Sequence, residues 1–225
     1  MPSLMRARFV TAVAICLLSV ASTARSQEPN FAKDGFYVGA AGAPNFTLDG
    51  VTFDGTSVYQ KVDGDEFLIL PHLERKNTFR GFAGFRSGRG AFEVGYEQTT
   101  HPGTFAGFTG EATFHSLSFD ERIFLLTRGR IQPYGLLGLS VPWLTVKDGA
   151  FLDNDVADGS FRGFGINTEA GVTVFPQSRV GISAGYRYRT MWFDSASGVS
   201  RTAYKLRPRF RETAGSVSIS AFVTF

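Results

Sequence analysis

The side chains best suited to acid–base chemistry near neutral pH are three histidines, and they stand far apart in the sequence. His72 and His101 fall in separate long connections, while His115 directly precedes Ser116. Neighbouring residues on a strand point to opposite faces, so His115 cannot activate the Ser116 hydroxyl. The next residue on the face of His115 is Leu117. The spacing predicts a protein that is not an enzyme, although a site built from the long connections stays open.

Cysteine and metal chemistry have no support in the residue types. Cys16 is the single cysteine and lies within the first twenty residues, so a disulfide framework, a cysteine zinc site and a thiol nucleophile are excluded from the remaining chain. No two histidines have the spacing of metal ligands. We expect neither a metal nor a cofactor.

Charged side chains recur at alternate positions, opposite bulky apolar ones. A face that carries charge together with many Gly and Ser residues suits the interior of a narrow barrel. Charges withdrawn from water must be paired, and the planar fork of Arg suits such pairs. We predict one internal ion-pair network of five arginines and four carboxylates: Arg80, Arg86, Glu93, Glu97, Asp120, Arg122, Glu169, Arg187 and Arg189.

The elements that position these charges alternate with a period of two. The clearest segment is 213–225, where Val217, Ile219 and Val223 share one face and Ser216 and Ser218 share the other. Residues 163–175 and Arg179–Phe193 repeat the pattern. Such alternation predicts strands with one apolar and one polar face.

Eight such strands are predicted, and their connections alternate between short and long. The remaining strands are Phe36–Ala43, Phe79–Arg86, Ala91–Gln98, Thr113–Leu126 and Ile131–Val146. The short connections are Ser87–Gly90, Thr127–Arg130 and Pro176–Ser178, and the long ones are Pro44–Thr78, Thr99–Ala112, Lys147–Arg162 and Asp194–Glu212. The pattern is typical of an all-β, eight-stranded antiparallel transmembrane up-and-down β-barrel, with short periplasmic turns, long extracellular loops and both termini at the periplasmic end.

One carboxylate breaks the apolar face of these strands. Glu121 falls among Leu117, Phe119 and Ile123. A carboxylate at the bilayer centre is costly. We therefore expect either a β-bulge at Glu121 or a position near the membrane interface.

Aromatic residues gather at the predicted strand ends, as in the interfacial girdles of membrane barrels. Phe36, Phe85, Phe92 and Phe175 lie next to short turns or termini, and Tyr96, Trp143, Trp192 and Phe193 lie next to long loops. A soluble barrel of lipocalin type is the alternative, and it would place large apolar residues inside.

The first 26 residues have the order of a secretory signal peptide. Arg6 and Arg8 precede an apolar run, residues 10–20, that is too short to span a bilayer, and a small-residue region follows. Cleavage after Ala24 or after Ser26 fits, and residues 27–225 form one barrel domain. Residues 1–26 hold three of the 23 Lys and Arg and none of the 20 Asp and Glu, so the exported chain is neutral. A nucleic-acid partner is not expected.

The chain resembles the small outer-membrane β-barrel family of OmpA/OmpX type, including opacity-like and porin-like barrel domains. The similar stretches are Gly35–Gly39 (GFYVG), Phe92–Tyr96 (FEVGY), Gln132–Ser140 (QPYGLLGLS), Glu169–Val172 (EAGV) and Gly185–Tyr188 (GYRY), with the terminal Phe225. The resemblance implies a Gram-negative outer-membrane location. It also implies insertion by the barrel assembly machinery, with Phe225 as part of the recognition signal.

The function expected from these features is structural or interactive, because an eight-stranded barrel is filled by its own side chains and long loops carry function. A narrow porin-like channel for ions or small solutes is the alternative, and a lipid A-modifying enzyme is a third. The apolar patch Phe67–Leu70 would pack on the barrel rim or bind a partner. The basic loop Arg201–Arg211 would contact lipopolysaccharide phosphates or lie solvated. We expect a monomer in outer-membrane lipid and lipopolysaccharide, with an extracellular ligand or a host surface as the partner of the loops.

Overall fold

The computed structural model describes residues 30–48, 52–53, 56–57, 59–62, 66–69, 72–105, 108–152, 155–197 and 203–225. Side chains are described for residues 30–43, 76–102, 111–147, 159–193, 195 and 213–225. The predicted signal peptide, residues 1–26, lies outside the described residues. Within them, no helix is both long and apolar enough to cross a membrane.

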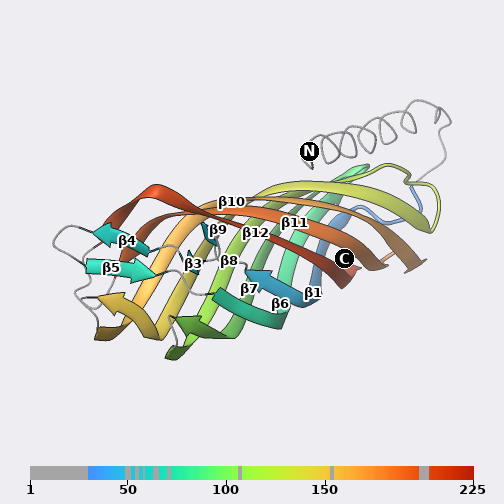
Figure 1. Ribbon diagram of the computed structural model, residues 1–225. Helices are drawn as coiled ribbons and strands as arrows, with labels where there is room; N and C mark the ends of the chain where they lie inside the picture. Colours follow the sequence, from blue (N-terminus) through green and yellow to red (C-terminus); the bar gives the residue numbers. More distant parts are fainter. Residues whose placement is uncertain are drawn as a thin grey trace, which may run out of the picture.

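Eight long strands close into one antiparallel barrel, which confirms the predicted fold (Figure 1). The strands are β1 (Gly35–Leu48), β6 (His72–Ser87), β7 (Gly90–Phe105), β8 (Phe108–Phe124), β9 (Ile131–Leu152), β10 (Asp155–Gln177), β11 (Val180–Ser197) and β12 (Ala203–Thr224). Each pairs with its neighbours in the chain, and β1 closes the ring by pairing with both β12 and β6. All eight predicted strands are present.

The strands run further at the long-connection end than the sequence predicts. β7 and β8 stay paired up to Phe105 and Phe108, inside the predicted loop Thr99–Ala112. β9 pairs with β10 up to Leu152 and Asp155, and β11 pairs with β12 up to Ser197 and Ala203. Three of the four long loops are therefore mostly strand, including much of the basic segment Arg201–Arg211. Outside a bilayer both faces of a hairpin can meet water, so these extensions need no apolar alternation.

The fourth long connection, between β1 and β6, carries two small hairpins. They are formed by β2 (Thr52–Phe53) with β3 (Thr56–Ser57), and by β4 (Tyr59–Val62) with β5 (Glu66–Ile69). β5 lies against β9, which stands across the ring from β1, and β4 lies against β12. This hairpin therefore lies beside barrel strands, while the side chains of the patch Phe67–Leu70 lie outside the described ones and its two interpretations stay predictions.

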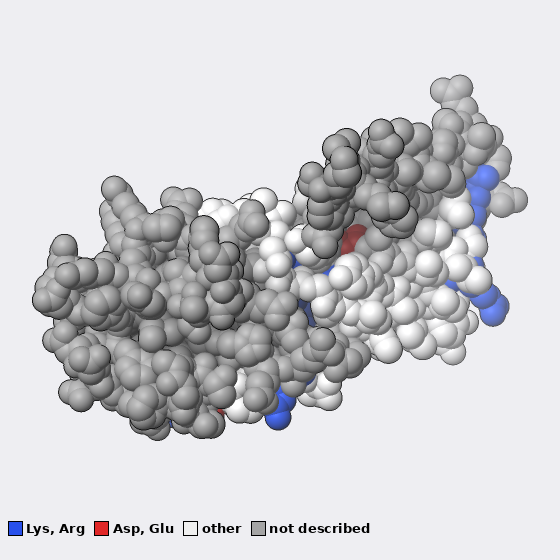
Figure 2. All heavy atoms as spheres, viewed as in Figure 1, with Lys and Arg blue, Asp and Glu red and all other residues white. Residues whose placement is uncertain are grey.

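The barrel wall is apolar on its outside. The outward positions hold Phe, Val, Ile, Leu and Tyr side chains, and many of them are more than two-fifths exposed. Figure 2 shows the described wall as mostly uncharged, with basic side chains near the short-turn end. Such a band is the lipid-facing surface of a membrane barrel.

Glu121 is a charged residue that lies among the apolar outward side chains of β7, β8 and β9, near the short-turn end. It pairs with Phe92 and Leu137, three positions before β8 ends at Phe124. No register shift occurs between β8 and its neighbours there. The expectation of a bulge is wrong, and the position near the membrane interface explains the carboxylate.

A short segment ahead of β1 crosses the short-turn end and touches all three short turns. The Phe31 N–H donates to the Thr127 carbonyl, and the Lys33 N–H donates to the Ser178 carbonyl. Asp34 accepts a hydrogen bond from the N–H of Gly88, a turn residue with a φ of 59°. The C-terminal Phe225 N–H donates to the Phe36 carbonyl, so both ends of the barrel lie here.

Candidate functional site in the barrel interior

All nine charged side chains predicted for the interior lie inside the barrel. Each is buried, from fully buried Glu93 and Asp120 to Glu169 at 7% exposure. The alternation places them there because inward positions on a strand recur every second residue. They come from five strands, β6, β7, β8, β10 and β11, and all but Arg86 meet across the lumen.

Asp120 is the centre of this cluster. Its Oδ2 accepts from Arg80 Nη2 at 2.7 Å and lies 3.5 Å from Arg187 Nη2, so it joins two arginines from different sides of the barrel. Ser118 donates to the same oxygen, and the Asn167 amide donates to Oδ1 at 3.0 Å. A fully buried carboxylate is satisfied in this way by charge and by hydrogen bonds together.

Glu93 forms the second junction. Its Oε1 lies 3.0 Å from Arg122 Nη2 and its Oε2 lies 3.4 Å from Arg80 Nη1. Tyr37, which the sequence analysis did not select, donates its hydroxyl to Oε1 at 3.0 Å. Arg122 also stacks on the Tyr134 ring, with its guanidinium carbon 4.3 Å from the centroid. Both tyrosines occupy inward-facing positions in the alternation of their strands. That position is the signal by which the sequence could have identified them.

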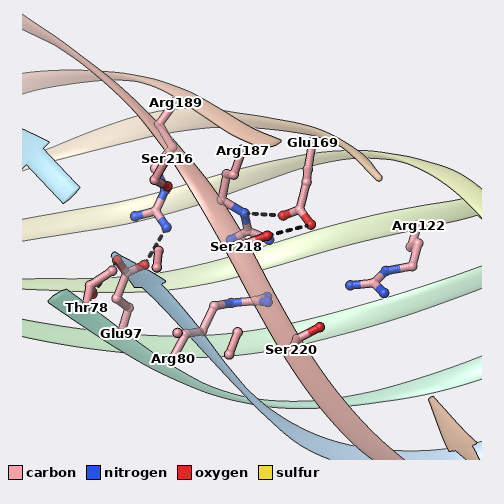
Figure 3. Close-up of a pocket in the computed structure, with 13 residues that line it drawn as sticks. Thr78, Arg80, Glu97, Arg122, Glu169, Arg187, Arg189, Ser216, Ser218 and Ser220 are labelled. Atoms are coloured by element: carbon pink, nitrogen blue, oxygen red, sulfur yellow. Dashed lines mark hydrogen bonds and ion pairs between the residues drawn. The ribbon is translucent and has the colours of Figure 1, made fainter. Parts of the chain in front are cut away.

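Two further pairs complete the network. Arg187 Nε lies 2.7 Å from Glu169 Oε2, and Tyr134 and Ser218 donate to the other oxygen of Glu169. Arg189 pairs with Glu97, which also accepts from the Thr78 hydroxyl. Four arginines and four carboxylates are thereby paired, as Figure 3 shows in part.

The fifth arginine, Arg86, lies apart from this network. Its Nη2 donates to Gln132 Oε1 at 2.8 Å, and its guanidinium stacks on Phe124 at 4.0 Å and Phe175 at 5.3 Å. Its carboxylate partner is Asp34 of the crossing segment, at 3.8 Å. The sequence predicts five internal arginines but only four carboxylates. Asp34, which precedes the first barrel strand, supplies the fifth carboxylate.

Apolar side chains fill the lumen on both sides of the charges, which the sequence analysis did not predict. At the short-turn end the cluster is Ala32, Tyr37, Phe82, Ala91, Phe124, Tyr134, Leu136, Phe175 and Phe222. Toward the long hairpins the buried apolar residues include Ala112, Phe114, Leu144, Val146, Phe161, Met191, Phe193 and Ala214. Large apolar residues inside the lumen therefore do not distinguish a soluble barrel from a membrane barrel in this protein.

Two of the predicted girdle residues belong to these internal layers. Phe175 and Phe193 are each 1% exposed. The prediction for them is wrong because it followed their aromatic type instead of the face that the alternation along the strand assigns to them. Phe175 follows the inward positions of β10, and Phe193 follows those of β11.

The other girdle residues face outward. Phe36, Phe85, Phe92 and Tyr96 are 70%, 45%, 53% and 43% exposed, while Trp143 and Trp192 are half-buried by neighbouring rings. Phe36 stacks edge-on with Phe85, and Trp192 stacks on Phe164. The terminal Phe225, predicted as the assembly signal, is 66% exposed.

The space left in the charged layer is small. A cavity of about 20 Å³ lies among Arg80, Glu97, Arg187 and Arg189 on one side and Ser216, Ser218 and Ser220 on the other (Figure 3). That is room for roughly one water molecule. The small residues of β1 and β12 form the wall toward which the arginines extend.

No acid–base pair of catalytic type is formed by the described side chains of His115 and Ser116. Ser116 faces the lumen, and His115 faces outward, where its Nδ1 lies 2.8 Å from the Tyr96 hydroxyl. His101 is fully buried. Among the described residues, no three His, Cys, Asp or Glu side chains group as metal ligands do.

The family model described as "Outer membrane protein beta-barrel domain" matches residues 10–208 of this chain. No curated protein is detectably similar to it in sequence.

Solved outer-membrane barrels have the same fold. Neisserial surface protein A (NspA) is 20% identical with a TM-score of 0.55, and the match covers 85% of this chain and 97% of NspA. OprG from Pseudomonas aeruginosa is 14% identical with a TM-score of 0.51, covering 86% of this chain and 97% of OprG.

Proposed function

Since the chain belongs to the outer membrane protein β-barrel domain family, we propose that it is an outer-membrane barrel with a closed lumen that acts through its surface hairpins. Its role is structural or interactive, as in an adhesin-like or opacity-like surface protein. The observation that carries the proposal is the filled interior, where paired charges lie between two apolar layers. A closed lumen leaves the exposed hairpins as the region that meets partners.

Three features support closure at successive depths. The segment Phe31–Asp34 ties the three short turns together at one end. In the middle, the ion pairs leave space for roughly one water molecule. Beyond them, β5 lies against β9 and β4 lies against β12, at the long-hairpin end.

The proposal includes the route to the membrane. The leader, residues 1–26, would direct export and be cleaved after Ala24 or Ser26, and Phe225 would guide insertion by the barrel assembly machinery. The exposed position of Phe225 at the end of the last strand is compatible with recognition there. We propose a monomer, since the closed ring leaves no edge of a barrel strand for pairing with a second copy.

Planar bilayer recording tests the proposal against the narrow channel. The mature chain, refolded in detergent and shown to migrate differently on gels with and without boiling, is added to a bilayer in 1 M salt. We expect the gel shift and no steady single-channel conductance. Discrete openings of constant size that appear only with the heat-shifting form would overturn the closed lumen and favour the channel.

A further inference from the structure

On the outer wall, the change from apolar to polar residues marks the membrane border on four neighbouring strands. Toward the long hairpins, Tyr96 is followed on the same face by Gln98 and Thr100, and Leu117 by His115 and Thr113. On β9 the change comes after Trp143, at Thr145, and on β10 Phe164 gives way to Arg162. Aromatic residues at such a border lie at the level of lipid headgroups.

Three side chains at this border form a rigid cluster. The Tyr96 hydroxyl lies 2.8 Å from His115 Nδ1, and the imidazole stacks on Trp143 at 5.1 Å with an angle of 10° between the rings. Tyr96 and Trp143 lie 6.1 Å apart. The Tyr96 hydroxyl also lies 3.4 Å from Gln98 Oε1. His115 Nε2 is the ring nitrogen left for a ligand, as a donor when the tyrosine donates to Nδ1 and as an acceptor when the tyrosine donates to Gln98. Because Tyr96 and Trp143 hold the His115 ring in one orientation, the ring is pre-positioned to bind a ligand at the membrane border.

A groove runs beside this cluster along the lipid-facing wall. It has a volume of about 440 Å³ and lies between Phe79 and Tyr96, over Ala40 and Gly81, with Gln98 and Thr100 also lining it. Ala40 pairs with Gly81 and Gly81 with Tyr96, so two small residues form a hollow beside exposed rings. Since the groove belongs to the wall that contacts the bilayer, its occupant there is a lipid.

Charge around the cluster selects among lipids. Arg162 is exposed and pairs in register with Trp143. Lys147 is exposed two outward positions beyond Trp143 on β9, but it pairs in register with the exposed Glu111. Arg162 is therefore the basic side chain that would meet a headgroup. Basic side chains at a membrane border favour anionic headgroups. Side-chain amides and hydroxyls such as those of Gln98 and Thr100 suit the hydroxyl and amide groups of a glycolipid.

From these observations we propose that the groove and the Tyr96–His115–Trp143 cluster bind the lipid A part of lipopolysaccharide. One acyl chain lies between Phe79 and Tyr96, and the phosphorylated sugars lie against His115 and Arg162. The inference rests on the outer-membrane location that underlies the proposed function. It does not depend on whether the lumen is closed.

Tryptophan fluorescence of the folded, full-length mature protein tests the site. The chain has two tryptophans, so Trp192→Phe leaves Trp143 as the only reporter. Lipid A is titrated into this protein in detergent micelles, with phosphatidylglycerol and phosphatidylethanolamine as comparison lipids. We expect a saturable change in Trp143 emission with lipid A at concentrations where neither phospholipid gives one.

A matched pair of glycine variants separates the groove from the rest of the wall. A Cβ atom added at Gly81 or at Gly135 meets no atom within 4 Å, and both residues face outward, so Gly81→Leu and Gly135→Leu should both fold, with the gel shift as the check. Gly81→Leu fills the groove and should weaken lipid A binding about tenfold, the effect of displacing roughly two methylene groups. Gly135→Leu should leave it unchanged.

Three outcomes overturn the proposal. Equal affinity in the two glycine variants excludes the groove as the site. Equal binding of phosphatidylglycerol and lipid A excludes the glycolipid as the specific ligand. An unchanged affinity in His115→Phe, for which we expect a loss of about threefold from one missing hydrogen bond, excludes the cluster. None of these readouts depends on conductance, so failure here and failure of the closed lumen are distinguishable.

Discussion

The charged middle layer of the lumen and the aromatic layer at the short-turn end close the same barrel in different ways. In the middle layer, Asp120 and Glu93 each join two arginines in a region with almost no free space. At the short-turn end, Phe124, Phe175 and Phe222 pack ring against ring. The charged layer depends on every partner, because removing one leaves a buried charge, whereas the aromatic layer loses only area and contacts.

The largest effect is expected from removing the central carboxylate. Asp120→Ala leaves Arg80 and Arg187 without their shared partner and should lower the free energy of unfolding by about 3–5 kcal/mol. Urea unfolding in lipid vesicles measures the change. Glu121→Gln, one residue away but on the outer face, is the control and should stay within about 0.5 kcal/mol. Equal effects of the two variants would contradict a sealed network.

A smaller loss is expected when shape is kept and only charge is removed. Glu169→Gln keeps the side-chain volume but weakens the bond to Arg187 and the bonds from Tyr134 and Ser218. We expect about 2–3 kcal/mol of destabilisation and no new conductance. Unchanged heat resistance together with a rise in single-channel conductance would identify this pair as a gate.

The aromatic layer should tolerate truncation better. Phe175→Leu removes ring contacts with Phe124 and Phe222 and part of the stacking on Arg86. We expect about 1–2 kcal/mol, measured by the same urea titration. Phe36→Leu, on the exposed outer face, serves as the control. A loss above that of Asp120→Ala would reverse the ranking of the two layers.

The smallest effect is expected at the edge of the aromatic layer, where the ion pair is partly exposed. Asp34→Asn removes the 3.8 Å partner of Arg86 and weakens the bond from the Gly88 N–H. Because the Asp34 side chain is 49% exposed, we expect at most about 1 kcal/mol, decreasing further in high salt. Lys33→Gln is the matched control, since Lys33 bonds through its backbone N–H. A larger loss that salt does not reduce would mean that Asp34 belongs to the buried network.

The two layers also differ in how much of them the sequence predicts. Period-two alternation is enough to put Arg80, Asp120 and Arg187 in the lumen, because parity fixes the face of each residue. It cannot name the partners, since Arg187 meets Asp120 only when β8 and β11 face each other across the closed ring. Parity also assigns Phe175 and Phe193 to the interior, but their aromatic type suggested the membrane interface.

Features outside the membrane were harder to predict. The pairing of Thr104 with Thr109 and of Leu152 with Asp155 extends hairpins whose sequences are rich in Gly, Thr and Asp. Nothing in such sequences separates paired strand from loop, because no apolar face is required there. The contact of Asp34 with Arg86 joins a segment ahead of the first strand to the lumen. No local sequence pattern predicts this contact.

Accessibility of the charged layer to a water-soluble reagent tests the closed lumen most directly. The only cysteine, Cys16, lies in the predicted leader, so the mature chain accepts single cysteines as probes. Ser220→Cys faces the cavity, and Ser87→Cys lies exposed at a short turn. With a charged thiol reagent on the folded protein in vesicles, a closed lumen predicts rapid modification at position 87 and almost none at position 220. Comparable rates at both positions would contradict it.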